Sequence, residues 1–319
     1  MIINIYNYGI EMIDTKLIMM EGLPSTGKTT NSQFLQIQLE RNENNVKWIH
    51  EVAHPHPTIF LADKFSLDNS SKKITLNKWR EFSTKILSIK NEVYILDSAF
   101  FQFQIFWFLL NNALYTDLNN FINELFEMIK SLNPCLIYLY REDTEKTINY
   151  LENERGTQDL EKIWNRDKLM PYYQNKPTGS EGFKHFLRDY SHIAKLLFDT
   201  SLCKKLSIEI SEGDWNNYED KLLSFLNIKR MPNPHFLPFN GIFKNKTYDF
   251  VIKIDNLSIF DPNGNTRKLI PKSNNEFYVE RLPVIIRFID SELIIMEGMQ
   301  IIEKWTEIGL EYKKIDILD

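Results

Sequence analysis

The sequence predicts an α/β fold followed by a smaller β domain, on the strength of three observations. Residues 22–29, Gly22-Leu23-Pro24-Ser25-Thr26-Gly27-Lys28-Thr29, form a complete Walker A sequence between an apolar run and a helical segment. Up to about residue 228, apolar runs alternate with helical segments, which is typical of a parallel sheet covered on both faces. After residue 230, short alternating segments and turn residues take over, which indicates an antiparallel sheet or barrel with strands expected over 248–254, 257–260, 267–270, 276–280, 284–288, 292–296 and 312–317.

Five apolar runs have the length of buried strands: 16–21, 46–51, 92–96, 136–140 and 206–210. The helix expected after the Walker A sequence spans 30–41, with apolar residues at Phe34, Leu35, Ile37 and Leu39. The segment 100–110 is apolar nearly all round, which favours burial between a sheet and another layer. An aromatic wall of this kind could also stack on a planar ligand, with Gln102 offering hydrogen bonds.

The Walker A sequence predicts a phosphate cradle. Its glycines let the backbone wrap closely around an anion, and the N-terminus of the next helix adds positive potential. Lys28 would reach the β- and γ-phosphates of a nucleotide, and the Thr29 hydroxyl would bind Mg²⁺. We therefore expect a nucleoside triphosphate, ATP with Mg²⁺, to be bound by Gly22, Pro24, Ser25, Thr26, Gly27, Lys28, Thr29 and Thr30.

Polar residues at the carboxyl ends of the other strands are further site candidates, because ligands of open α/β sheets bind at that edge. Asp97 follows the third strand and has the place of a Walker B acid that holds Mg²⁺. The alternative is a cap for the following helix. Arg141 after the fourth strand and Asp214 after the fifth are candidate nucleotide contacts.

Glu51 ends the second predicted strand, where a carboxylate could accept the proton of an attacking hydroxyl group during phosphoryl transfer. His54 and His56 follow in a loop stiffened by prolines, and could orient an acceptor or contact a phosphate. With Glu51 they also suggest a metal site, but no fourth ligand with suitable spacing appears. A surface loop that happens to carry histidines is an equal alternative.

A long charged helical stretch between the fourth and fifth strands has the composition of a lid. Arg155 is followed by Gly156, a cation next to a natural hinge, and Arg166 lies further along. Such arginines can compensate the charge that spreads over the transferring phosphoryl group once a lid closes. Interspersed acids leave an ordinary solvated helix face as the alternative.

Together these features resemble the nucleoside and nucleotide kinase branch of P-loop proteins, with thymidylate kinase and deoxynucleoside kinases as well-known members. The resemblance covers about residues 16–228, and the runs 137–143 and 153–156 also look like a poorly characterised bacterial P-loop group. It implies strand order 2-3-1-4-5, Mg·ATP as donor and a hydroxyl or phosphate acceptor near Glu51. Asp97 is followed by Ser98, where these kinases usually carry arginine, and the β domain belongs to neither kinase group.

The competing function is a P-loop NTPase that acts as a switch or binding module, with the β domain docking a partner. A GTPase would need Asn-Lys-x-Asp, and Asn175-Lys176-Pro177-Thr178 fails at its last position. A transporter-type ATPase would need Leu-Ser-Gly-Gly, which the sequence lacks. The kinase interpretation predicts Lys28, Glu51, Asp97 and Arg155 as catalytic, His54, His56, Gln102 and Arg166 as acceptor-binding, and Thr29 and Asp97 as metal ligands.

Composition sets the remaining expectations. The net charge of −5 over 319 residues argues against a nucleic-acid partner, and no apolar run is long enough to cross a bilayer. The two cysteines, one of them inside an apolar strand, favour a reduced, cytoplasmic protein. We expect an N-terminal extension over 1–15, with Met12 as a second candidate start, a kinase-like domain over 16–230 and a β domain over 231–319. The β domain carries no evident catalytic cluster, so a packing or substrate-covering role is expected.

Overall fold

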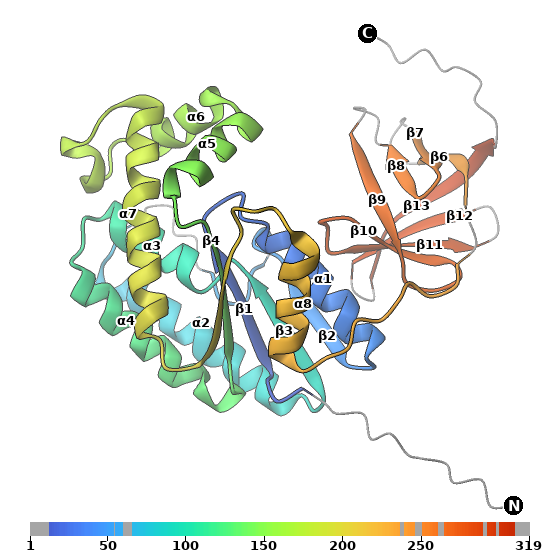
Figure 1. The fold of residues 1–319 in the computed structure, drawn as a ribbon, viewed down its shortest axis with the longest axis horizontal. Coiled ribbons are helices and arrows are strands. Elements are labelled where there is room, and N and C mark those ends of the chain that lie inside the picture. The colour runs from blue at the N-terminus through green and yellow to red at the C-terminus, as the bar shows by residue number, and fades with distance from the viewer. Residues whose placement is uncertain are drawn as a thin grey trace, which may run out of the picture. The chain divides into compact units, whose positions relative to one another are not determined.

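The computed structural model describes residues 13–53, 55–59, 66–236, 239–245, 251–260, 265–289, 292–297 and 300–309. The chain divides into two compact units, Met1–Arg230 and Met231–Asp319, and each is described by itself (Figure 1). Among the described residues, no helix is both long enough and apolar enough to cross a membrane.

The first unit is built on a five-stranded parallel sheet, which confirms the predicted fold class. Its order is β2-β3-β1-β4-β5. The strands are β1 (Leu17–Gly22), β2 (Asn45–Ile49), β3 (Glu92–Asp97), β4 (Cys135–Tyr140) and β5 (Lys204–Glu209). Because β1 is central and flanked by β3 and β4, the carboxyl ends of these three strands lie side by side at one edge of the sheet.

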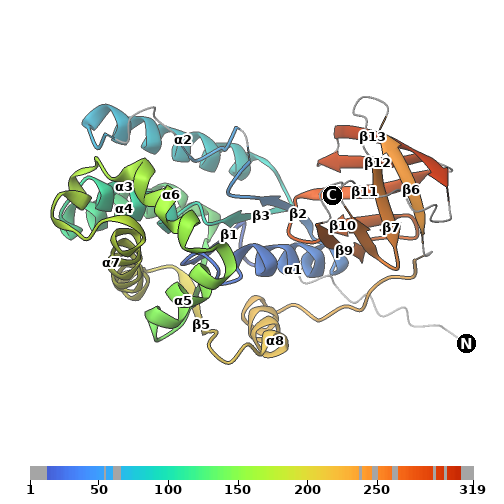
Figure 2. The same ribbon diagram turned by 90° about the horizontal axis from the view of Figure 1, so that it is seen from above.

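Helices cover both faces of this sheet (Figures 1 and 2). Alternate residues of β1 point to opposite faces. Leu17 and Met19 join a core that includes α2, α3, α4 and α7, whereas Ile18 and Met20 join a core with α1 and α8. The helices are α1 (Lys28–Arg41), α2 (Asn69–Ser88), α3 (Phe101–Leu110), α4 (Tyr115–Ile129), α5 (Thr144–Arg155), α6 (Thr157–Asp167), α7 (Gly179–Thr200) and α8 (Trp215–Leu226), with short 3₁₀ turns η1 (Lys130–Leu132) and η2 (Pro171–Asn175).

The aromatic helix α3 lies mostly in the core, as its composition favours. Phe101, Ile105 and Phe108 are at most 1% exposed. The Phe106 ring is half-buried and contacts the ring of Phe186 on α7, with 4.6 Å between centroids. Gln102 is the polar exception in the first turn of α3, and its contacts belong to the site.

The second predicted strand ends two residues earlier than expected. β2 stops at Ile49, because His50 closes a turn on the residues that follow. The His50 carbonyl accepts from the Ala53 amide at 2.9 Å, and its Nδ1 accepts from the Val52 amide at 3.2 Å. Glu51 therefore lies in this turn rather than in the strand.

The second unit confirms the predicted antiparallel β domain, in its barrel form. Within the described residues, neighbouring strands pair in the closed order β10-β11-β12-β13-β6-β7-β8-β9. Closure removes the free strand edges that an open sheet would expose. The aromatic core includes Phe239 and Phe288, which stack at 4.2 Å, and Phe277 against both. The strands are β6 (Gly241–Asn245), β7 (Val251–Asp255), β8 (Ser258–Phe260), β9 (Thr266–Pro271), β10 (Glu276–Val279), β11 (Val284–Ile289), β12 (Glu292–Glu297) and β13 (Gln300–Gly309).

Individual barrel strands differ from the expected ones. The strand expected over 248–254 is present from Val251, and 248–250 lie outside the described residues, as does the whole strand expected over 312–317. Strands β6 and β13 were not predicted. The register of β13 shifts against β12 and against β6, and such bulges break the two-residue alternation by which strands are recognised.

A chain that ends after Arg230 should fold by itself. Arg230 belongs to the first unit, because its guanidinium binds Glu219 at 2.7 Å and Asp220 at 2.9 Å on α8. Circular dichroism should show helical signal and one cooperative thermal transition. A chain ending after Ile228 is the matched control, and loss of these exposed pairs should lower its stability by at most about 1 kcal/mol. Aggregation of both chains would contradict independent folding.

Candidate functional site: a phosphate cradle at the carboxyl edge of the parallel sheet

The Walker A residues form a tight loop between β1 and α1. A Cβ on Gly22 would lie 2.3 Å from the Leu139 carbonyl oxygen, and one on Gly27 would lie 2.8 Å from the Trp215 ring, so both positions require glycine. The Thr26 hydroxyl and the Lys28 ammonium each donate to the Leu23 carbonyl at 2.8 Å. Gly27 caps α1 without a side chain, which leaves the first amides of the helix available to an anion.

The other predicted catalytic residues, Glu51, Asp97 and Arg155, all interact electrostatically with Lys28. Its side chain is buried, with the residue only 7% exposed, and burial lowers the pKa of the ammonium. The carboxylates of Glu51, Asp97 and Glu21 oppose the effect of burial and raise the pKa of Lys28, with Glu51 contributing most and Glu21 least. Arg155 lowers the pKa of Lys28. The structure therefore gathers Glu51, Asp97 and Arg155 around the Walker A lysine.

Asp97 ends β3 directly beside β1 and is fully buried. Its Oδ1 accepts from the Ser98 hydroxyl at 3.0 Å, whereas its Oδ2 is buried without a hydrogen-bond partner. Burial raises the pKa of Asp97, and Lys28 and the Thr29 hydroxyl oppose that rise. The alternative that Asp97 caps the next helix is wrong, because the N-cap of α3 is Phe100. An unpartnered carboxylate oxygen beside Thr29 fits a Mg²⁺ site.

Glu51 and Gln102, predicted separately as base and acceptor contact, touch each other. The Gln102 side-chain amide donates to Glu51 Oε2 at 3.1 Å. Glu51 comes from the turn after β2 and Gln102 from the first turn of α3, so this bond joins two segments at the carboxyl edge of the sheet.

Glu21 is a site residue that sequence reasoning missed. It lies at the end of β1, is fully buried, and accepts from the backbone amides of Phe100 at 2.7 Å and Gln102 at 3.2 Å. Burial raises the pKa of Glu21 to about 7, although these backbone bonds and Lys28 lower it. The available signal was a single acid ending an otherwise apolar run, directly before the first glycine of the Walker A sequence.

The histidine loop is described only in part. His54 lies outside the described residues. His56 is buried, and its Nδ1 accepts from the backbone amides of Thr58 and Ile59, both at 3.2 Å. Burial lowers the pKa of His56 to about 4, so the ring is neutral at physiological pH. Its Nε2 is buried without a partner, and a role of this atom toward an acceptor stays a prediction.

The lid arginines have different surroundings. Arg155 ends α5 and is exposed, and Gly156 follows with a φ of 83° at the junction with α6. The neighbouring Glu154 accepts from the Ser25 hydroxyl in the Walker A loop at 2.5 Å. Arg166 instead forms a bidentate pair with the buried Asp167, at 2.7 and 2.6 Å. The guanidinium of Arg166 is thus paired within α6, and its contact with an acceptor stays a prediction.

The segments that follow β4 and β5 carry two more predicted site residues, Arg141 and Asp214, with aromatic rings near this part of the site. The Arg141 guanidinium lies over the Tyr150 ring at 5.2 Å, and burial lowers its pKa. Asp214 caps α8 by accepting from the Asn217 amide at 3.2 Å. Trp215, which the sequence analysis also missed, has its ring against Gly27 although the residue is 41% exposed. Its contact with a loop almost 190 positions earlier leaves no local sequence signal.

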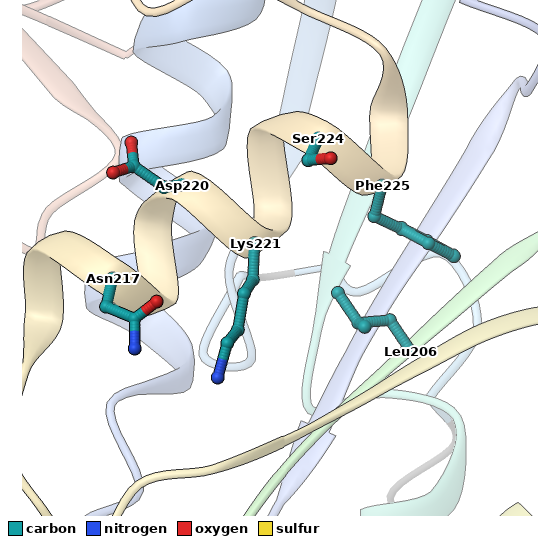
Figure 3. Close-up of a pocket in the computed structure, with 6 residues that line it drawn as sticks. All are labelled: Leu206, Asn217, Asp220, Lys221, Ser224 and Phe225. Atoms are coloured by element: carbon teal, nitrogen blue, oxygen red, sulfur yellow. The ribbon is translucent and has the colours of Figure 1, made fainter.

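Figure 3 shows a cavity elsewhere on the first unit, between β5 and α8. Its volume is about 470 Å³. None of its lining residues is a predicted site residue: Leu206, Asn217, Asp220, Lys221, Ser224 and Phe225. The candidate site is therefore the Walker A loop with the charged residues around it, and this cavity is not part of it.

The solved structures that resemble this chain include two distant likenesses, YorR and Kti12. No protein-family model matches the chain, and a search of curated proteins found no match. YorR from Bacillus subtilis, solved with phosphorylated GDP, is 12% identical with a TM-score of 0.38, over 66% of this chain and 95% of its own. Kti12 from Chaetomium thermophilum, solved with ADP-AlF3, is 16% identical with a TM-score of 0.33, over 66% and 98%. At this identity and TM-score, neither likeness carries an argument about function.

Acid should destabilise the wild-type protein through His56. Its pKa is about 4 when folded and ordinarily 6.5, so between these values the unfolded chain binds the additional proton. Stability should therefore fall as pH drops from 6.5 to 4, by roughly 3 kcal/mol in total. His56→Asn keeps an acceptor near the Nδ1 position and cannot titrate. Urea unfolding of both proteins at several pH values should show the difference, and parallel curves would mean that His56 is not held neutral.

Proposed function

We propose that the chain is an ATP-dependent phosphotransferase, a P-loop kinase that moves the γ-phosphoryl group of Mg·ATP to a hydroxyl or phosphate oxygen of a small molecule or a peptide. The observation that carries the proposal is the set of charges acting on Lys28. A metal-holding acid, Asp97, would suffice for a loop that only binds a nucleotide. The additional carboxylate of Glu51 supplies a base, and Arg155 supplies a second cation.

The donor nucleotide would occupy the cradle. The residues from Gly22 to Thr30 would surround its phosphates with backbone amides, and Lys28 would leave the Leu23 carbonyl to bind the β- and γ-phosphates. Anion binding there is favoured by the uncapped N-terminus of α1. Arg141 and Asp214, with Trp215, would lie on the side of the nucleotide base.

Thr29 and Asp97 would hold Mg²⁺. The unpartnered, buried Oδ2 of Asp97 offers Mg²⁺ one oxygen ligand. No group of three or more His, Cys, Asp or Glu side chains in the described part of the chain could hold a metal ion, so phosphate oxygens and water would complete the coordination. When bound, Mg²⁺ neutralises charge on the phosphates.

Glu51 would act as the general base. The acceptor hydroxyl gives its proton to the Glu51 carboxylate, its oxygen forms a bond to the γ-phosphorus, and the bond from that phosphorus to the bridging oxygen breaks to release ADP. Gln102 orients Glu51 through the 3.1 Å hydrogen bond. His54, His56 and Arg166 are proposed to line the acceptor side. Lys28 and Arg155 would compensate the charge that develops on the transferring group.

Lys28→Ala should abolish turnover of Mg·ATP without unfolding the protein, because the ammonium is proposed to bind phosphate and, among the described residues, donates to the Leu23 carbonyl alone. ADP release measured with a panel of hydroxyl and phosphate acceptors is the assay. Lys162→Ala, at an exposed lid lysine, is the matched control and should behave like the wild type. Turnover in a folded Lys28→Ala protein would contradict the proposal.

Glu51→Gln should lower acceptor-dependent turnover by roughly 10²-fold, the usual scale for loss of a general base. The affinity for Mg·ADP should stay nearly unchanged, and Glu127→Gln, at an exposed acid on α4, serves as the control. If wild-type turnover is slow and no acceptor stimulates it, the switch or binding function is favoured instead.

Arg155→Ala should lower kcat about tenfold or more while KM for ATP changes little, because an exposed lid cation acts on the phosphoryl group mainly in the transition state. Lys162→Ala again serves as the control within the same lid. A rise in KM alone would show that Arg155 binds the ground-state nucleotide rather than assisting transfer.

A further inference from the structure

We infer that Glu21 is a positioning residue: its carboxylate fixes the first turn of α3 and, through Gln102, the orientation of Glu51. Only the last link, the role of Glu51 as a base, rests on the proposed function. The chain of contacts from Glu21 to Glu51 is a property of the structure itself.

The first link is the anchoring of α3. The N-cap residue Phe100 provides no side-chain acceptor, and the first amides of a helix need one. Glu21 Oε1 accepts from the Phe100 amide at 2.7 Å, and Oε2 accepts from the Gln102 amide at 3.2 Å. With one oxygen on each of two amides, the carboxylate fixes both the position and the rotation of this turn.

The second link leads outward to Glu51. Gln102 is held at its backbone by Glu21, and its side chain donates to Glu51 Oε2 at 3.1 Å. One residue thus connects a fully buried carboxylate with one in the half-buried turn after β2. A small rotation of the α3 turn would move the Gln102 amide and release Glu51.

The complete burial of the Glu21 carboxylate indicates a role beyond packing. A fully buried carboxylate is costly, and an apolar residue would pack in the strand without that cost. The groups that face Glu21 are the Lys28 ammonium on α1 and the hydroxyls of Tyr138 on β4 and Tyr190 on α7. Glu51 also acts on Tyr190, whose buried hydroxyl has no partner. The two carboxylates therefore share surroundings as well as the Gln102 connection.

The contact should depend on protonation. Ionised Glu21 accepts with both oxygens, whereas protonated Glu21 turns one oxygen into a donor that opposes a backbone amide. The pKa of about 7 places this change near neutral pH. Gln102, and Glu51 with it, should be held most firmly above pH 7 and less firmly below.

A double-mutant cycle tests the route. ADP release from Mg·ATP, with water as the acceptor, is compared for the wild type, Glu21→Gln, Gln102→Ala and the double variant. Each single change should lower turnover about tenfold, the scale of a modest misplacement, with Mg·ADP affinity within about threefold of the wild type. If Glu21 acts through Gln102, the double variant should be no more than about twofold slower than the slower single variant. Independent effects that multiply would overturn the inference.

A second measurement needs no turnover. In protein labelled with ¹⁵N-glutamine, the side-chain amide signal of Gln102 is identified by its absence from Gln102→Ala. It should shift with pH around 7 in the wild type and lose that shift in Glu21→Gln, whereas Glu127→Gln should keep it. A signal indifferent to Glu21→Gln would overturn the inference whatever the activity. If instead Glu51→Gln turns over like the wild type, the proposed function fails while the Gln102 signal still decides the role of Glu21.

Discussion

The rest of the first unit is organised around one buried positive charge, the ammonium of Lys28. Burial without opposing charge would disfavour the ionised form, so the fold must bring carboxylates to it. Those carboxylates come from the ends of β1 and β3 and from the turn after β2. The order β2-β3-β1 places these three ends in sequence along one edge of the sheet. The strand order therefore brings the three carboxylates together where they offset the buried charge of Lys28.

The acids around Lys28 outnumber the cations. Among the described residues, three acids, Glu21, Asp97 and Glu51, and one further cation, the more exposed Arg155, act on Lys28. Both fully buried carboxyl groups have raised pKa values. A protein selected only for stability would have no reason to bury two carboxyl groups whose ionised forms are disfavoured by burial. A ligand that brings a cation would offset the charge of these carboxylates and stabilise the folded state by mass action. This electrostatic cost is concentrated around Lys28 and Asp97, the second of which is a proposed ligand of Mg²⁺.

Sequence could predict what depends on local pattern and on strand topology. The Walker A loop, the alternation of strands and helices and the place of Asp97 at the end of β3 follow from such patterns, because parallel strands present their carboxyl ends at one edge. Glu51 was expected at the end of β2 and lies instead in the turn after it. Contacts between residues far apart in the sequence could not be predicted from these patterns. Glu21 caps a helix 79 positions later, and Trp215 packs on Gly27 from the far end of the unit. The pairing of Arg166 with its neighbour Asp167 depends on the burial of that acid, which charge patterning does not show.

The end of α5 adds a constraint on how the lid can respond to an anion. Glu154 and Arg155 are consecutive, and Glu154 is bonded to Ser25 in the loop while Arg155 acts on Lys28. An anion bound in the Walker A loop would repel the Glu154 carboxylate and attract the Arg155 guanidinium. Anion binding would therefore exert opposite electrostatic forces on two consecutive residues at the end of α5. Gly156 follows directly, and a Cβ there would meet nothing within 4 Å. Glycine is thus required at this junction by its φ of 83° and not by crowding, which leaves space around the backbone at the point where α5 and α6 join.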